Sequence, residues 1–435
     1  MSHERVAQFL REHDVRTVEI GFPDTHGILR GKRVATPYFL DKVRSGFAFA
    51  KAVLVWDLQC GVFPEYPGQE WTNFDNGYGD LMAVPDLSTL RLVPWRERTA
   101  MVLCDLFEDG APCQMSSRSI LRRVVQEAED LGYAVDTAAE LEFYVLDEYR
   151  RPYRDGLQTY SLNRGADLEP VLEEIRISLE DMGILIEACN MEHGPAQVEI
   201  NLRHAPALQS ADNALLFKYV VKEVCKKHGL MASFMPKPFA DASGNGLHLH
   251  QSLWDPDRRQ NLFSGDEEFA RQYIGGLLAS MREFYVLGAP SVNAYKRRRT
   301  YTFAPTNVTW GGNNRTVAVR ALLSGGYGSR VEQRCGSADA NPYLFAAANL
   351  AAGVQGIKQG LQPGDPTPGD AYAVKAQELP FSLGEALDLF VASPAAHTIF
   401  GTPFVNLFAS IGRHEVDLWN AAITDWERDR YLEWA

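Results

Sequence analysis

The sequence predicts an α+β protein in which a small β-rich domain, residues 1–107, precedes a large domain, residues 108–435. Two observations lead to this prediction. Between residues 17 and 106, short apolar stretches alternate with turn-forming residues, as in antiparallel sheets. Beyond Ser117, amphipathic segments of helical period alternate with short strand-like segments. The chain therefore changes its character about a quarter of the way along.

The small domain is predicted to begin with a β-hairpin. Residues 17–22 alternate in polarity, residues 24–27 (DTHG) favour a turn, and residues 28–34 return as a second strand. The domain ends at a polar turn over residues 107–110, where we place the boundary.

The large domain is predicted to start with a helix over residues 120–131, with Ser117 as its N-cap and Gly132 at its end. The further predicted strands are 139–146, 197–202, 247–253 and 330–334, and the further predicted helices are 170–182, 211–228, 267–285 and 342–357. The last of these helices has no polar face, which predicts that it is buried. Prolines and glycines in residues 362–370 predict a loop, and residues 404–435 predict one or two surface helices.

Composition excludes several classes of protein. The chain has 435 residues, 46% of them hydrophobic, and a formal net charge of −13, so it is neither disordered nor basic enough for a dedicated nucleic-acid binder. The charged N-terminal stretch cannot serve as a signal peptide, and no apolar run reaches the ~18 residues that suggest a membrane span. Six scattered cysteines without a C-x-x-C pair predict reduced thiols and a cytoplasmic location.

Two pairs of glutamates could bind a cation. Glu140 and Glu142 leave the same face of a predicted strand, where divalent ions would relieve their repulsion, although solvated strand faces often carry such pairs. Glu192 and Glu199 flank a Gly-Pro turn that can bring them together, but an acidic loop explains them equally well.

Histidines and arginines extend the pattern. His248 and His250 share a strand face and could bind a metal or phosphates, or simply be buried histidines of the core. Around Glu332 stand many arginines, which favour an anionic ligand over structural ion pairs: Arg297, Arg298, Arg299, Arg315, Arg320, Arg330 and Arg334. Carboxylates favour Mg²⁺ or Mn²⁺, and arginines beside such a site suggest phosphoryl transfer from a nucleotide. Neither a Walker motif nor G-x-G-x-x-G after a strand is present.

In this order, the segments AELEFY, EHGPAQVEIN, GNGLHLHQSL, YKR, NNRTVAVR and RVEQR…ANPYL resemble the glutamine synthetase superfamily, and the bacterial type I form in particular. The similarity covers nearly the whole chain and is densest between Glu140 and Leu344. The resemblance implies a β-grasp-like N-terminal domain and a catalytic α/β domain. It also implies ATP as co-substrate, two or three Mg²⁺ or Mn²⁺ ions per subunit, and a dodecamer of two hexameric rings.

The resemblance assigns a role to each matching residue. Ligands of a first ion would be Glu142, Glu192 and Glu199, and ligands of a second would be Glu140, His248 and Glu332. The arginines implied to be catalytic are Arg297, at the glutamate α-carboxylate, Arg334, near the γ-carboxylate, and Arg315 and Arg320, at the phosphates. The ATP site would also include His250, Ser252 and Arg330, and Gly244 would approach the amino-acid substrate.

Departures from the family pattern bear on the nitrogen substrate. Phe303 stands where the family flap has a glutamate, and Ala50 stands where the N-terminal domain has an ammonium-binding aspartate, with Lys51 beside it. Because a desolvated ammonium ion without a counter-charge costs several kcal/mol, free ammonium should bind poorly. The prediction is a γ-glutamyl-amine ligase, with Ala50 acting in the neighbouring subunit's pocket.

Smaller departures concern the acid substrate and regulation. Ser243 replaces an asparagine near the substrate amine, so the acid could be a glutamate analogue. The C-terminal region lacks the regulatory tyrosine loop, which predicts no adenylylation. The alternatives are a conventional glutamine synthetase and a non-catalytic sensor or structural protein. In every case we expect small-molecule substrates and no nucleic-acid or membrane partner.

Overall fold

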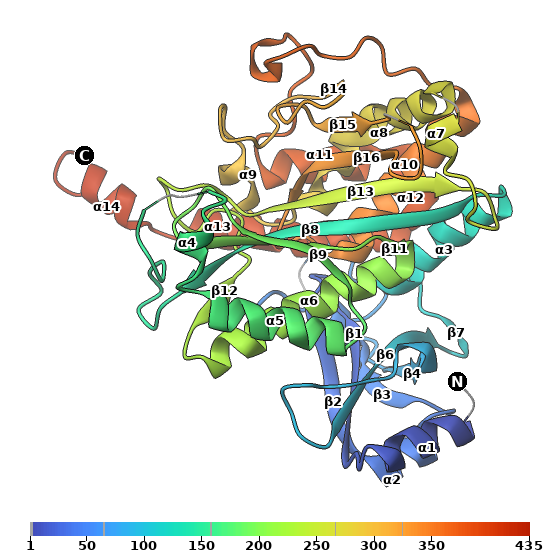
Figure 1. Cartoon of the computed structure of the whole chain (residues 1–435). Helices are drawn as coiled ribbons and strands as arrows, with labels where there is room; N and C mark the ends of the chain where they lie inside the picture. The colour runs from blue at the N-terminus through green and yellow to red at the C-terminus, as the bar shows by residue number, and fades with distance from the viewer. Residues whose placement is uncertain (1–2, 64–65, 157–158, 266, 324) are drawn as a thin grey trace.

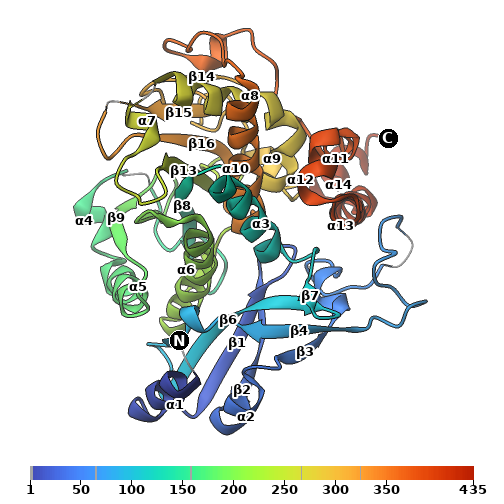
Figure 2. The same ribbon diagram turned by 90° about the vertical axis from the view of Figure 1, so that its right-hand side faces the viewer.

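A computed structural model describes residues 3–63, 66–156, 159–265, 267–323 and 325–435 of the chain. It contains two β-sheets, a smaller N-terminal sheet and a larger one that helices cover on one face (Figures 1 and 2). Within these described ranges, no helix is both long and apolar enough to cross a membrane.

The small sheet has the mixed topology of a β-grasp-like domain, with the strand order β2-β1-β6-β4-β3. Its main strands are β1 (Thr17–Pro23), β2 (Leu29–Ala35), β3 (Phe47–Ala50), β4 (Asp80–Pro85) and β6 (Thr99–Glu108). The predicted hairpin is confirmed: β1 and β2 pair antiparallel around a turn in which Gly27 adopts a φ of 73°. On its other side β1 pairs in parallel with β6. Helices α1 (His3–Glu12) and α2 (Thr36–Lys42) belong to the same domain.

The predicted boundary between residues 107 and 108 falls inside β6, and two short strands, β5 (Arg91–Leu92) and β7 (Ala111–Pro112), still pair with β6. The division into two domains remains a proposal, and the loop after β7 suits it better. Helix α3 (Ser117–Asp130) follows, with Ser116 rather than the predicted Ser117 at the N-cap.

The large sheet has the strand order β14-β15-β16-β13-β8-β10-β9. Its strands are β14 (Trp310–Gly311), β15 (Val319–Leu322), β16 (Arg330–Ser337), β13 (Gly246–Trp254), β8 (Ala134–Leu146), β10 (Gln197–Leu202) and β9 (Ile186–Met191), and β11 (Ala205–Pro206) and β12 (Met231–Ser233) also pair with β8. The four strands predicted for this domain are confirmed, although β8 begins five residues before its predicted start at residue 139.

One face of the large sheet is covered by α3, α6 (Ala207–Lys227), α8 (Glu267–Gly288) and α10 (Pro342–Gln359). Helix α10 is buried along nearly its whole length, as predicted. Gly276 and Gly356 permit its close approach to α8, because a Cβ on Gly276 would lie 2.0 Å from the Ala352 carbonyl oxygen.

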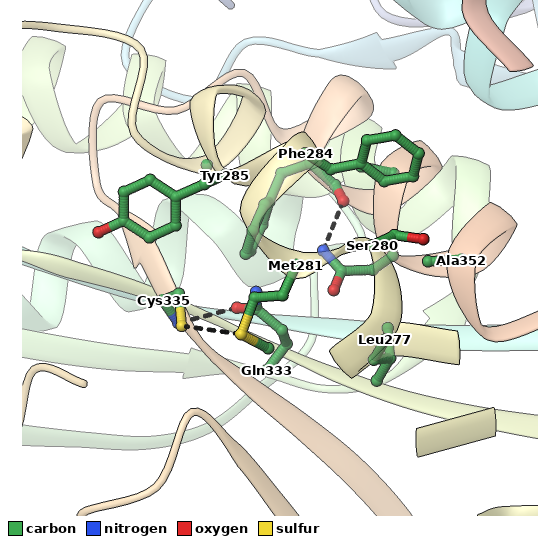
Figure 3. A pocket seen from close by; sticks show the side chains of 12 residues that line it. Leu277, Ser280, Met281, Phe284, Tyr285, Gln333, Cys335 and Ala352 are labelled. Atoms are coloured by element: carbon green, nitrogen blue, oxygen red, sulfur yellow. Dashed lines mark hydrogen bonds between the residues drawn. The ribbon is translucent and has the colours of Figure 1, made fainter. Parts of the chain in front are cut away.

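Successive side chains of strand β16 point to opposite faces of the large sheet. Figure 3 shows Gln333 and Cys335 beside a small cavity that Met281 and other residues of α8 line, and the Cys335 Sγ lies 4.0 Å from the Met281 Sδ. Because side chains alternate along a strand, Glu332 and Arg334 point to the opposite, open face.

The remaining helices are α4 (Leu162–Gly165), α5 (Glu169–Asp181), α7 (Leu262–Gly265), α9 (Ala294–Arg297), α11 (Leu383–Ala392), α12 (Pro394–Phe400), α13 (Thr402–Ala421) and α14 (Asp425–Tyr431). The prediction of surface helices at the C-terminus is half wrong, because the first half of α13 is buried through residues such as Phe404 and Leu407. Only α14 and the end of α13 are exposed.

A buried arginine joins the two sheets. The Arg118 side chain of α3 is 1% exposed and donates to Asp212 of α6 over 2.9 and 2.8 Å. It also donates to Asp105 of β6 over 2.5 Å and to Asp86, just after β4, over 2.8 Å. If the two sheets moved apart, the buried Arg118 guanidinium and its carboxylate partners would lose one another and remain as uncompensated charges. The cost of such unpaired buried charges opposes relative movement of the sheets. This cluster therefore links the small sheet to the helices α3 and α6 that cover the large sheet.

Candidate active site

Five of the six predicted metal ligands lie in one row across the open face of the large sheet, and the sixth, Glu192, follows β9 directly in the turn before β10. The register of the strands places Glu199 of β10 opposite Glu142 of β8, and His248 of β13 opposite Glu140. His250 then lies opposite Glu332 of β16. The period-2 alternation of four neighbouring strands thus gathers side chains that are far apart in the sequence.

One end of this row can hold a cation. Ligand atoms of Glu140, His250 and Glu332 all lie within 4.8 Å of one another. The predicted ligand His248 belongs to the same group, because its Nδ1 is 2.7 Å from the Glu140 Oε1 and 3.6 Å from the Glu332 Oε1. The buried His248 Nε2 has no hydrogen-bond partner among the described residues. A buried polar nitrogen without a partner suits a site that binds a further group.

The other end of the row is rich in acids. Burial, together with the charges of Glu140, Glu142 and Glu192, raises the pKa of Glu199 to about 10. Burial and the charge of Glu142 likewise raise the pKa of Glu192 to about 7. Both shifts mean that this cluster holds more negative charge than its environment tolerates. A divalent cation would supply the missing positive charge, so the residues present fit a metal.

Glu332 differs from these acids because it has cationic neighbours. Burial opposes its ionisation, but the charges of Arg334, His248 and His250 hold the pKa of Glu332 at about 2. The Arg334 Nη1 donates to one carboxylate oxygen over 2.5 Å, and the Arg320 Nη1 donates to the other over 2.9 Å. Glu332 therefore connects the metal cluster to two of the predicted catalytic arginines.

The five residues predicted to bind ATP line one cleft of about 470 Å³ beside the metal cluster. They are His250, Ser252, Arg315, Arg320 and Arg330. The three arginines among them supply charged donors that suit the phosphates of a nucleotide, although acids such as Glu140 also line the cleft.

Sequence reasoning missed further residues of this cleft. The rings of Trp254 and Tyr327 lie with their centroids 4.5 Å apart, and the His204 Nδ1 lies 3.1 Å from the Asp136 Oδ2. Extending the period-2 pattern would have found two of them, because Asp136 precedes Glu140 by four residues and Trp254 follows His250 by four. Tyr327 lies in a loop and carries no such signal.

Arg297 and Gly244 are also brought together. The buried Arg297 ends the one-turn helix α9 and packs onto two glycines. A Cβ on Gly244 would lie 2.6 Å from the Arg297 Cγ, and one on Gly246 would lie 2.6 Å from the Arg297 Nη2. Only glycine leaves room for this arginine at the edge of the metal row. Beside them, the carbonyl oxygen of Ser243 accepts a hydrogen bond of 2.7 Å from the Tyr144 hydroxyl.

The two residues predicted to shape the amine pocket do not lie next to each other in the structure of one subunit. The carbonyl oxygen of Phe303 accepts a 3.4 Å hydrogen bond from the Arg334 Nη2, and its side chain is 56% exposed. Ala50 is exposed at the end of β3 in the small sheet, away from β8, β13 and β16 (Figure 2). Lys51 is not a free charge in this region, because it forms an ion pair with Glu108.

Residues 114–431 match the family model described as "Glutamine synthetase, catalytic domain". The chain belongs to the glutamine synthetase family. Among family members, it is 38% identical to a glutamate–isopropylamine ligase from Pseudomonas sp, over 99% of this chain and 97% of that protein. It is 37% identical to gamma-glutamylethanolamide synthetase GlnA4 from Streptomyces coelicolor, over 97% and 93%.

The family also includes conventional enzymes, and the chain is 33% identical to the glutamine synthetase of Methanosarcina mazei, over 99% of this chain and 97% of that protein. A solved structure titled "GmaS/ADP complex" superimposes with a TM-score of 0.88 at 30% identity, over 98% of this chain and 99% of that chain. For this glutamine synthetase family member, the catalytic domain implies the use of ATP and a divalent metal.

The acid cluster predicts a pH-dependent effect of metal on stability. In the metal-free protein, Glu192 and Glu199 keep protons that they lose on unfolding, because their ordinary pKa is 4.5. The folded state then binds more protons, so the free energy of unfolding should fall as pH rises from 4.5 through about 7 for Glu192 and towards about 10 for Glu199. Mg²⁺ should offset this loss, and the rise in Tm at saturating Mg²⁺ should be larger by several degrees at about pH 8 than at about pH 6.

Thermal unfolding with and without Mg²⁺ at both pH values measures this effect. The double variant Glu192→Gln, Glu199→Gln should flatten the pH dependence of the metal-free protein. An equal Mg²⁺ effect at both pH values in the unmodified protein would contradict the prediction.

Proposed function

We propose that the protein is an ATP-dependent ligase that joins the γ-carboxylate of glutamate to an organic amine. The observation that carries the proposal is that Phe303, the residue that the sequence resemblance aligns with a flap acid of the family, contacts Arg334 through its backbone and has an apolar side chain. A ring at this position cannot neutralise a bare ammonium ion as a carboxylate would. Two relatives at 37% and 38% identity are named as enzymes that act on organic amines, which supports the same substrate class.

The reaction that suits these residues has two steps. An oxygen of the glutamate γ-carboxylate attacks the terminal phosphorus of ATP, and ADP leaves, giving an acyl phosphate. The ammonium form of the amine releases a proton to solvent, and the free amine nitrogen then attacks the acyl carbon. The nitrogen loses a second proton to solvent as the C–O bond to phosphate breaks and inorganic phosphate leaves. Arg297 would hold the α-carboxylate, and Arg315, Arg320 and Arg330 would stabilise negative charge on the phosphates.

We propose Mg²⁺ or Mn²⁺ as the metal, at two or three positions per subunit. Glu142, Glu192 and Glu199 would hold one ion, and Glu140, His248 and Glu332 would hold a second, with His250 close by. When bound, these ions would supply positive charge to the phosphates.

We further propose a dodecamer of two hexameric rings, with each active site completed by a neighbouring subunit. Ala50 is exposed and distant from this chain's own metal row, so it would act in the adjacent site. The C-terminal segment supports extensive contacts between subunits, because Trp426, Leu432 and Trp434 are 61%, 75% and 81% exposed.

A panel of nitrogen substrates tests the proposed activity, with phosphate release as the readout in the presence of ATP, Mg²⁺ and glutamate. The panel contains ammonium, ethanolamine, isopropylamine, aniline and putrescine. We expect at least one small monoamine to exceed ammonium in kcat/KM by about tenfold or more, since the pocket lacks the family acid. Faster turnover with ammonium than with every organic amine would support a conventional glutamine synthetase instead. Absence of phosphate release with all of them would support a non-catalytic relative.

A further inference from the structure

Three aromatic side chains surround the flap loop between α9 and β14. Tyr301 is 77% exposed and Phe303 is 56% exposed, while Tyr372 is half-buried. The ring centroids of Tyr301 and Tyr372 lie 5.4 Å apart, and the Tyr372 hydroxyl donates a 3.1 Å hydrogen bond to the carbonyl oxygen of Ala304. We call Tyr301, Phe303 and Tyr372 the aromatic rim.

The loop that carries the rim is held in an unusual backbone conformation. Tyr301 and Phe303 adopt φ values of 61° and 57°, which are rare for bulky side chains. Contacts on both sides maintain it: the Arg334 Nη2 donates to the Phe303 carbonyl oxygen, and the Thr302 Oγ1 donates to the Arg299 carbonyl oxygen over 2.7 Å. Such residues persist where the surrounding structure holds them, and they cluster at functional sites.

The rim lies beside the arginines of the substrate site. Arg334 contacts it directly through Phe303. Burial raises the pKa of Tyr372, while the charges of Arg334 and Arg297 act on the same phenol in the opposite direction. A neighbouring carboxylate, that of Asp370, accepts a 2.9 Å hydrogen bond from the Tyr372 backbone N–H. Two of the three aromatic residues, Phe303 and Tyr372, therefore lie next to Arg334, the arginine that the family resemblance places near the γ-carboxylate.

We propose that the aromatic rim binds the amine substrate as its alkylammonium ion, through cation–π contacts with the ring faces. This inference rests on the proposed ligase function and specifies the form in which its nitrogen substrate is recognised. An alkylamine resembles the lysine side chain, with a pKa near ~10.4, and is protonated at neutral pH. Aromatic faces attract such cations, and the alkyl groups supply apolar contact that ammonium lacks. The rim therefore favours small primary alkylammonium ions.

Tetramethylammonium tests this inference in the unmodified enzyme, because it carries the charge and methyl groups but no N–H to react. We expect it to inhibit competitively against ethylamine, and not against ATP or glutamate. The uncharged tert-butyl alcohol, which is similar in size, should inhibit at least about threefold more weakly, since it has no charge for the ring faces to attract.

Variants assign the effect to the rim. Phe303→Leu and Tyr301→Leu keep apolar side chains but remove the aromatic faces. Each should raise the KM for ethylamine and the inhibition constant of tetramethylammonium together, by about three- to thirtyfold, with the KM for ATP unchanged. Phe303→Tyr keeps an aromatic face and should raise both constants less than Phe303→Leu does. The control is Tyr38→Leu, which removes another exposed ring, on α2, and should change neither constant.

The outcomes separate this inference from the ligase function. Equal inhibition by tetramethylammonium and tert-butyl alcohol, in an enzyme that prefers organic amines, would overturn cation–π recognition and leave the proposed function standing. Unchanged constants in both leucine variants would do the same. A preference for ammonium over every amine would overturn the proposed function itself.

Discussion

Replacement of Glu332 by glutamine is expected to lower kcat by at least about a hundredfold, with little change in fold. The Glu332 side chain is 1% exposed and joins the cluster formed with Glu140 and His250. Its two oxygens also accept from Arg334 and Arg320. Glutamine has the same shape but no charge, so the variant would weaken metal binding and leave two arginines without their counter-charge.

Steady-state phosphate release and calorimetric titration with Mg²⁺ measure the two effects of this substitution. The matched control is Glu180→Gln, which removes the same charge from an exposed position at the end of α5 and should leave both quantities unchanged. Thermal unfolding of the two variants separates loss of function from loss of structure. A folded Glu332→Gln variant with normal turnover and Mg²⁺ affinity would show that this carboxylate takes no part in catalysis.

Much of the fold could be predicted because local patterns decide it. The strand predicted over residues 197–202 has the bounds of β10, and the alanine-rich helix predicted over residues 342–357 is buried as α10. The start of β8 at Ala134 was missed, because polar Asp136 and Thr137 interrupt the apolar pattern that marks a strand. The helix predicted over residues 211–228 likewise omits the first turn of α6, which begins at Ala207.

The candidate site was predictable only in part. Residues two apart on a strand share a face, so Glu140 with Glu142 and His248 with His250 follow from alternation alone. Which strands are neighbours is a property of the whole sheet, and the sequence analysis did not predict it; the family resemblance supplied only which residues would act together. Lys51 shows the opposite case: its place next to Ala50 suggested a charge near the amine, but its partner Glu108 is 57 residues away.

The largest change of specificity is expected from Phe303→Glu, which should raise kcat/KM for ammonium by at least about tenfold and lower it for organic amines. Phe303 is 56% exposed, and its carbonyl oxygen lies 3.4 Å from the Arg334 Nη2, so a carboxylate introduced at this exposed position would remain ionised. Its charge would then offset the cost of desolvating ammonium, which an aromatic ring cannot do for so strongly hydrated an ion.

Phe303→Gln is the matched control, because it removes the ring and introduces a polar side chain of the same size as glutamate but without the charge. Both variants should lose turnover with organic amines, but only Phe303→Glu should gain turnover with ammonium, measured as phosphate release across a range of ammonium concentrations. Arg334 already forms an ion pair with Glu332. The new carboxylate would therefore have to compete for this guanidinium, and we expect it to stay available to the substrate. Equal ammonium use by the two variants would show that charge at this position does not set the choice of nitrogen substrate.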